Sequence, residues 1–180
     1  TINAGSGNDT INIEGVDGSF SANLIVNGNA GSVLVNFQTT PTNIGTGALT
    51  VSTDLIEVLT TVTANGGITL QPEDNAAAIA LGTAVANFRL REIELTRLAS
   101  TGTVTIGRAS GFGPINIADS VDGNLNLSGE SYHLTLRGGT LTFGAGLTLG
   151  SDRVLTLQTG AITSPHLGTD VTIGGSAGRA

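Results

Sequence analysis

The stretch of residues 101–163 reads TGTVTIGRASGFGPINIADSVDGNLNLSGESYHLTLRGGTLTFGAGLTLGSDRVLTLQTGAIT. It repeats one small unit, in which an apolar, a polar and an apolar residue are followed by a turn. The units are VTI, INI, LNL, LTL, LTF, LTL and LTL, beginning at residues 104, 115, 125, 134, 141, 147 and 155. Such alternation is typical of a short strand with one buried face, and the intervening Gly, Asn, Asp and Ser supply turns. The stretch therefore predicts a succession of short strands.

The spacing of every third unit indicates how these strands pair. A near-constant step of 20 to 23 residues leads from Val104 to Leu125 to Leu147, from Val121 to Leu141 to Ile162, from Leu81 to Val104, from Ile93 to Ile115 and from Leu98 to Val121. Hairpins would pair neighbouring units at half that step, whereas a coil of this length with three short strands is typical of a parallel β-helix. We therefore expect an all-β fold, a right-handed parallel β-helix, as a three-sided solenoid with about 20–23 residues per coil.

Earlier segments extend the pattern less cleanly. Short runs such as LIV at 24, VLVNF at 33, LTV at 49, ITL at 68 and IAL at 79 alternate with turns, many of which contain glycine. Residues 55–62 could lie on one face of a helix, but we favour strands there. In residues 88–98, FRLREIELTRL, alternation of Leu90, Ile93 and Leu95 favours a strand, and a helical turn is the alternative.

Composition bounds the class of protein. The chain has 27 Gly and no Cys, Met or Trp, which predicts a thin core of stacked aliphatic side chains. Seven basic residues, all Arg, stand against fourteen acidic ones, giving a net charge of −7. This balance argues against binding to nucleic acid or to an anionic membrane surface. The longest uncharged apolar run, AAAIALGTAVANF from residue 76, is too short and too polar to span a bilayer.

The two ends of the chain can be joined without interrupting the pattern. DVTIGGSAGRA at the C-terminus would run into TINAGSGNDTINI at the N-terminus, and open ends of a β-helix expose unpaired backbone that invites association. We therefore expect residues 1–180 to form a single β-solenoid segment, either one period of a longer array or a subunit that self-associates end to end.

The first turn resembles a calcium-binding motif. Residues 5–11, GSGNDTI, are similar to the glycine-rich nonapeptide of the RTX proteins, G-x-G-x-D-x followed by a large apolar residue. In that family turn carbonyls and the Asp carboxylate bind calcium, so the resemblance implies a calcium ligand role for Gly5, Gly7 and Asp9. The alternative is a tight turn in which Asp9 bonds its own backbone, with no cofactor.

A second resemblance covers residues 90–163. The phrases REIELTRLASTGTVTIGRASG, INIADSV, LTLRGG and LTLQTGAIT resemble the filamentous haemagglutinin-like exoproteins, the giant two-partner-secretion surface adhesins of Gram-negative bacteria and cyanobacteria. The resemblance implies a secreted, extracellular protein at the bacterial cell surface, whose β-helical shaft presents adhesive regions.

An enzymatic function is an alternative to a structural one, because polysaccharide lyases and hydrolases also use β-helices. They need two or three carboxylates, or a carboxylate with Arg, on one strand face. The candidates are Asp119 and Asp122 with Arg108, or Glu92 and Glu94. Both Asp stand in turn-like contexts, and the charges of residues 89–97 are explained as a solvated, self-neutralising face.

The two histidines, His133 and His166, lack the ligand spacing of a zinc site.

Taken together, these features lead us to expect a non-catalytic extracellular structural protein, either the shaft of a bacterial surface adhesin or the repeating unit of a surface filament or sheath. Its partners would be further copies of itself and a host or surface carbohydrate or protein. A carbohydrate-active β-helix enzyme or a carbohydrate-binding module is the alternative.

Overall fold

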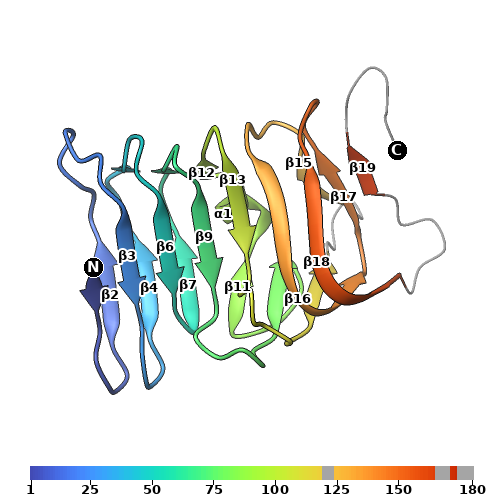
Figure 1. Ribbon diagram of the computed structural model, residues 1–180, viewed down its shortest axis with the longest axis horizontal. Helices are drawn as coiled ribbons and strands as arrows, with labels where there is room; N and C mark the ends of the chain where they lie inside the picture. The colour runs from blue at the N-terminus through green and yellow to red at the C-terminus, as the bar shows by residue number, and fades with distance from the viewer. Residues whose placement is uncertain (119–123, 165–170, 174–180) are drawn as a thin grey trace.

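The structure of the chain is a computed structural model that describes residues 1–118, 124–164 and 171–173. It is an all-β fold in which every recorded strand pair is parallel. Figure 1 shows the strands side by side along the long axis, with the N-terminal strands at one end and the C-terminal strands at the other. The predicted all-β, parallel character is thus confirmed, and the hairpin alternative is wrong for these strands.

The described residues form four sheets. The ten-stranded sheet has the order β1 (Ile2–Asn3), β3 (Leu24–Asn27), β6 (Leu49–Ser52), β9 (Ile68–Gln71), β13 (Thr103–Ile106), β16 (His133–Phe143), β14 (Ile115–Ala118), β10 (Ile79–Gly82) and β11 (Phe88–Leu90), with β18 (Leu155–Thr163) beside β16. Three smaller sheets have the orders β2 (Thr10–Ile13), β4 (Leu34–Phe37), β7 (Leu55–Val58); β12 (Leu98–Ala99), β8 (Val62–Thr63), β5 (Thr42–Asn43); and β15 (Asn124–Leu127), β17 (Gly146–Leu149), β19 (Val171–Ile173).

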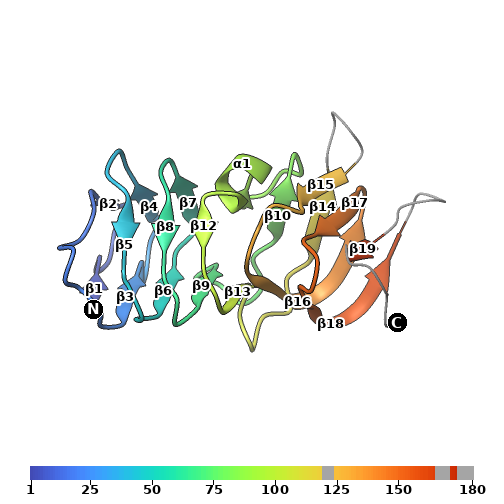
Figure 2. The same ribbon diagram turned by 90° about the horizontal axis from the view of Figure 1, so that it is seen from above.

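The chain visits these sheets in rotation. The strands β3, β4 and β5 belong to three different sheets, and β6, β7 and β8 return to the same three in the same order. In the view from above, the sheets lie around a common interior (Figure 2). This course is compatible with a β-helix, because like strands stack on like strands along the long axis.

All seven units that begin at residues 104 to 155 lie in strands. The units at 134 and 141 share the single long strand β16, which bends to pair with β13 at its start and with β14 at its end. Strands are also confirmed in residues 55–63, as β7 and β8.

The predicted steps hold near the C-terminus. Leu125 is in register with Leu147, and Leu141 with Ile162. In the N-terminal part the step is 19 to 25 residues, as Leu24 with Leu49 and Leu49 with Ile68 show.

The predicted steps through the middle of the chain are wrong. Val104 pairs with Ile68 and Leu134, not with Leu81 or Leu125, so the steps there are 36 and 30 residues. Leu98 pairs with Val62 instead of Val121, which lies outside the described residues.

The physical reason for the 36-residue step from Ile68 to Val104 is that the chain between β9 and β12 adds a loop, the strands β10 and β11 and a helical turn before it rejoins the same sheets. The strand predicted around Ile93 is the short helix α1 (Glu92–Leu95), and Ile93 itself is 53% exposed.

The core consists of apolar rows that run from strand to strand. One row has the register Ile2, Val26, Val51, Leu70, Ile106, Leu136 and Leu157. Its interior members are fully buried, each gaining about 1.5–3 kcal/mol on burial. The expectation of a purely aliphatic core is wrong in part, because Phe37, Phe88 and Tyr132 are among the largest buried side chains.

Candidate functional site

The described surface has a groove between β7 and β11. These strands are neighbours in space but belong to different sheets. The groove has a volume of about 270 Å³, and its lining residues are Leu34, Leu55, Ile56, Glu57, Ala86, Asn87, Arg89, Arg91 and Glu94. The lining combines apolar residues of β4 and β7 with charged residues of β7, β11 and the start of α1. A groove of this kind is the default place to look for a ligand.

Glu94 is a buried residue of the groove lining. It is 2% exposed, and its Oε1 accepts a hydrogen bond from the Val58 N–H at 3.1 Å. Its Oε2 accepts from the Arg91 N–H at 2.8 Å and from Arg91 Nε at 3.1 Å. The hydrogen bond and charge of Glu94 raise the pKa of Arg91 above its ordinary value, with a smaller contribution from Glu57. Both oxygens of Glu94 are thus committed to the fold.

Glu92 and Glu94, the candidate pair of the enzyme alternative, do not lie on one strand face. Both lie on α1, and the Oε2 of Glu92 accepts a hydrogen bond from the Asn126 N–H of β15 at 2.9 Å. Glu94 instead reaches β7, so the two carboxylates bind different strands. Figure 2 shows α1 between β12 and β15, which places it at this junction. The Arg97 Nη1 donates to the Val58 carbonyl at 2.7 Å, so it also completes the edge of β7.

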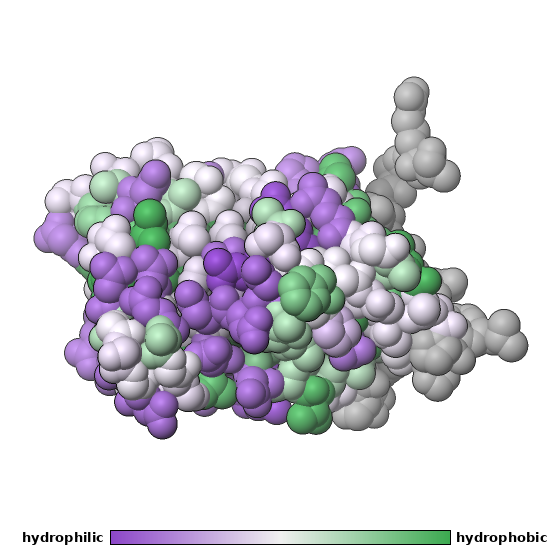
Figure 3. All heavy atoms as spheres, turned by 60° about the horizontal axis from the view of Figure 1, so that its bottom comes forward, coloured by the Kyte–Doolittle hydropathy of each residue, from purple (hydrophilic) through white to green (hydrophobic). Residues whose placement is uncertain are grey.

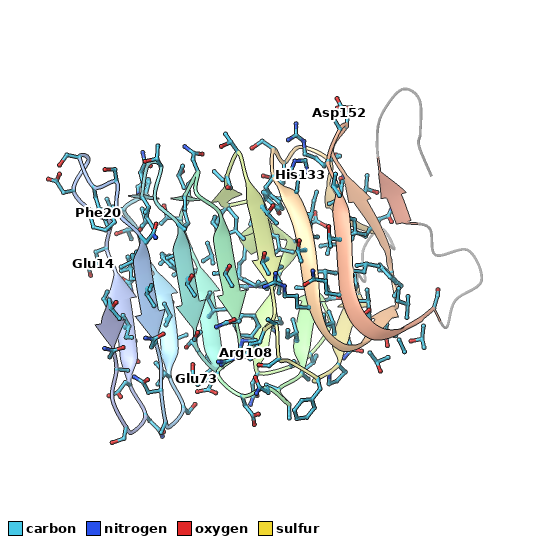
Figure 4. All side chains as sticks on the ribbon, in the orientation of Figure 1. Glu14, Phe20, Glu73, Arg108, His133 and Asp152 are labelled. Carbon is cyan, nitrogen blue, oxygen red and sulfur yellow. The ribbon has the colours of Figure 1, made fainter. Side chains whose placement is uncertain are left out.

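Arg108 is occupied by a neighbouring loop. Its Nη1 donates to the carbonyl of Pro72 at 3.1 Å and also to the carbonyl of Glu73. Figure 4 shows Arg108 and Glu73 close together at one edge of the molecule. The predicted partners Asp119 and Asp122 lie outside the described residues, so a triad with Arg108 stays a hypothesis.

The turn with Gly5, Gly7 and Asp9 packs against the turn of the next strand layer. Gly7 and Gly31 both have φ near +125°, and a Cβ on Gly31 would meet the Gly7 carbonyl at 1.8 Å. The Gly7 N–H donates to the Ala30 carbonyl at 2.9 Å, and Asn8 Oδ1 accepts from the Ser32 N–H at 3.2 Å. The sequence motif thus correctly marks a turn of glycines with positive φ.

One feature of this turn suits a calcium ion and another does not. Asp9 Oδ2 is buried without a hydrogen-bond partner, which suits a cation ligand. The position beside Asp9 in the next layer is Val33, because Thr10 is in register with Leu34, so no second carboxylate faces it there. Calcium takes six to eight oxygens. Within the described residues no group of three His, Cys, Asp or Glu side chains gathers to hold a metal. Calcium binding by Gly5, Gly7 and Asp9 stays a prediction.

The described histidine has a structural partner. His133 Nδ1 accepts a hydrogen bond from the Val154 N–H at 2.9 Å, and His166 lies outside the described residues. Sequence reasoning did not identify Glu57 as a groove residue, because it stands 37 positions before Glu94 and only the fold brings them together.

Comparison with known protein families, with curated proteins and with solved structures found no match for this chain. Across the part of the chain that the structure describes, no helix has the length and apolar character needed to cross a membrane.

Proposed function

We propose that this chain is part of a right-handed parallel β-helix that serves as a non-catalytic extracellular shaft, in a bacterial surface adhesin or a surface filament. The observation that carries the proposal is the unbroken register of the core row from Ile2 to Leu157, across seven strands. A protein built of repeated strand layers, each bonded to the next, has the architecture of a spacer rather than of a closed pocket.

The outer faces support the same function. A row of threonines runs in register through Thr50, Thr69, Thr105, Thr135 and Thr156; Thr156 is exposed, Thr50 and Thr69 are partly exposed, and Thr105 and Thr135 are buried. Neighbouring layers are also joined by side-chain hydrogen bonds, from Asn27 Nδ2 to Asn3 Oδ1 at 2.9 Å and from Gln71 Nε2 to Ser52 Oγ at 2.7 Å. Hydrophilic side chains cover much of the face in Figure 3. Such faces keep a long shaft soluble and present many weak contacts.

Surface labelling of producing cells tests this function. Antibodies raised against the folded chain should label intact cells, and brief external proteolysis should remove the label. Labelling that needs permeabilised cells would contradict an extracellular shaft. Negative-stain electron microscopy of the released material should show thin rods or filaments.

A carbohydrate-binding role is the second candidate, because the groove brings Arg89, Arg91 and Glu57 together with apolar side chains. Planar guanidinium groups suit the carboxylates and hydroxyls of acidic sugars. A glycan array, followed by the variant Arg89→Ala, tests it: specific binding should be lost in the variant. An array without binders, or reducing sugar released from a polysaccharide panel, would rule out a purely binding groove.

A further inference from the structure

The groove between β7 and β11 contains two charged side chains that no other group neutralises. Arg89 of β11 and Glu57 of β7 both line it, and both are exposed. Within the described residues neither side chain takes part in a hydrogen bond or an ion pair. Arg91, which also lines the groove, is instead held by Glu94 through its backbone N–H and its Nε. The groove thus offers a ligand one free guanidinium and one free carboxylate.

The edge of β7 adds a backbone donor and a backbone acceptor. The Leu55 N–H donates to the Val33 carbonyl at 3.0 Å, on the side of β4. Successive residues of a strand direct their N–H and C=O groups to opposite edges, so Ile56 and Val58 direct theirs toward β11. On that edge the Val58 groups bond to two side chains. Among the described residues no strand pairs with β7 there, which leaves the Ile56 N–H and C=O facing the groove that Ile56 lines.

The apolar part of the lining is aliphatic. Leu34 and Leu55 are in register on the outer face of β4 and β7, and Ala86 joins them from the loop before β11. These side chains give the C–H groups of a ligand a surface to pack against. The groove volume of about 270 Å³ lies just below the lower end, about 300 Å³, of the usual range for ligand pockets. It therefore suits one small unit of a longer ligand.

The charges distinguish between kinds of anionic ligand. A carboxylate carries one charge and matches the single free guanidinium of Arg89, with which it can form two parallel hydrogen bonds. A polysulfated or phosphorylated chain brings more negative charge close to Glu57 and Glu94, which repel it. Hydroxyl groups both donate and accept, so they suit Glu57, which only accepts, and the donor and acceptor of the Ile56 backbone. The lining therefore favours a ligand with one carboxylate and several hydroxyls.

We propose that the groove binds one uronic acid unit of an unsulfated acidic polysaccharide. The carboxylate of the sugar bonds to Arg89, its hydroxyls bond to Glu57 and to the Ile56 backbone, and its C–H groups pack against Leu34 and Leu55. This inference rests on the carbohydrate-binding role proposed above and deepens it by naming the sugar and the protein groups that recognise it. It does not depend on the shaft function.

Isothermal titration calorimetry with matched oligosaccharides tests the recognition of the carboxylate. The probes are the hyaluronan hexasaccharide, which carries glucuronate and no sulfate, its methyl ester, and a sulfated chondroitin hexasaccharide. The methyl ester has the same sugars without the negative charges. The unmodified hyaluronan hexasaccharide should bind about tenfold more tightly than its methyl ester, because the ester cannot form charge-assisted hydrogen bonds with a guanidinium. The sulfated hexasaccharide should bind no more tightly than the unsulfated one.

Variants of Arg89 test which side chain reads the carboxylate. Arg89→Ala should weaken binding of the hyaluronan hexasaccharide about tenfold, and Arg89→Lys should weaken it less, because an ammonium keeps the charge and loses the planar pair of donors. Arg137→Ala is the matched control, since Arg137 bonds to Gln158 outside the groove. Arg89 is exposed, so its replacement should leave the melting temperature unchanged, which a thermal melt checks.

Three results would each overturn the uronic acid assignment: equal affinity for the acid and its methyl ester, clearly tighter binding of the sulfated hexasaccharide, or unchanged binding by Arg89→Ala. A peptide with a free C-terminal carboxylate that binds more tightly than the hyaluronan hexasaccharide would overturn it as well. If neutral glycans on the array still bind, the carbohydrate-binding role stands and only the assignment of the sugar fails. If no glycan binds at all, both fail.

Discussion

Glu94 shows how one side chain joins elements that are far apart in sequence. Its carboxylate connects the start of α1 with the edge of β7, through the Arg91 and Val58 N–H groups. The edge of β7 has no strand bonded to it on this side, since β11 belongs to another sheet. Glu94 and Arg97 therefore satisfy the backbone of Val58 in place of a strand.

Replacing Glu94 by Ala should lower the free energy of unfolding by about 3 kcal/mol, because the buried Val58 N–H loses its acceptor. Urea denaturation followed by far-UV circular dichroism measures the change. Glu57→Ala is the matched control, since it removes an exposed carboxylate from the same groove. Equal effects of the two variants would contradict the role given to Glu94.

Tyr132, the only tyrosine, reports on the core. It is 1% exposed, and its hydroxyl donates to the Leu95 carbonyl at 3.2 Å. Burial, with a contribution from the Glu130 charge, raises the pKa of Tyr132 above its ordinary value of 10.0. The folded state then holds its proton more tightly than the unfolded state, so the stabilisation is complete below pH 10 and is lost as the pH rises above it.

Absorbance at 295 nm should therefore show no tyrosinate at pH 10 to 11 while the circular dichroism of the fold persists. Ionisation and unfolding should occur together at higher pH. In denaturant the same side chain should titrate near its ordinary pKa. Tyrosinate appearing near pH 10 in the folded protein would contradict the burial of Tyr132.

At the scale of elements, the approach of β13 to β16 depends on a glycine. Gly107 follows β13 with φ of +98°, and a Cβ there would meet the Arg137 carbonyl oxygen at 1.9 Å. Its N–H also donates to the Leu70 carbonyl at 2.9 Å. A side chain at this position would force three neighbouring layers apart.

Gly107→Ala should destabilise the protein by about 3 kcal/mol, from backbone strain and from this clash. Gly18→Ala is the control, because a Cβ at Gly18 meets nothing within 4 Å. That variant should stay within about 0.5 kcal/mol of the parent. Thermal melts of the two variants and the parent measure these differences in stability. A melting temperature of Gly107→Ala equal to that of the parent would show that the strand layers can move apart without cost.

The Gly5–Asp9 turn gives the calcium prediction a clear readout. If calcium binds, it should raise the melting temperature, a chelator should reverse the rise, and Asp9→Asn should abolish it. Asp17→Asn is the control, because Asp17 is an exposed acid that accepts hydrogen bonds from Ser19 within its own turn. A melting curve that neither calcium nor chelator changes would contradict calcium binding at this turn.

At the scale of the molecule, charge is distributed unevenly along the stack. The seven acids of residues 1–88 have no basic residue among them and so repel one another. Raising NaCl from about 0.02 to 0.5 M should increase the melting temperature at pH 7, because salt screens this repulsion. The increase should shrink near pH 4.5, the isoelectric point of the sequence, where part of the carboxylates are protonated and the net charge is near zero. The same salt effect at both pH values would point to a cause other than charge.

How well each feature of the fold was predicted depends on how far apart in the sequence the residues that determine it lie. Alternation in three residues marked the strands at 104, 115, 125 and 147, because one buried face is a property of the strand itself. The pairing of Leu125 with Leu147 also followed, since little separates those layers. In residues 88–98 the alternation was misleading, because the Glu94 side chain accepts a hydrogen bond from the Arg91 N–H and so caps a helical turn there.

The sequence by itself determined the strand units and the glycine turns, since each depends on residues that are close together in the chain, and the recurring step of about 20 residues predicted the parallel all-β class. Only the tertiary structure decided the 36-residue step from Ile68 to Val104, the burial of Glu94 and the groove beside it. These features depend on which layer a segment meets after a long insertion. That choice is set by contacts between residues more than thirty positions apart, and no local pattern of side chains encodes it.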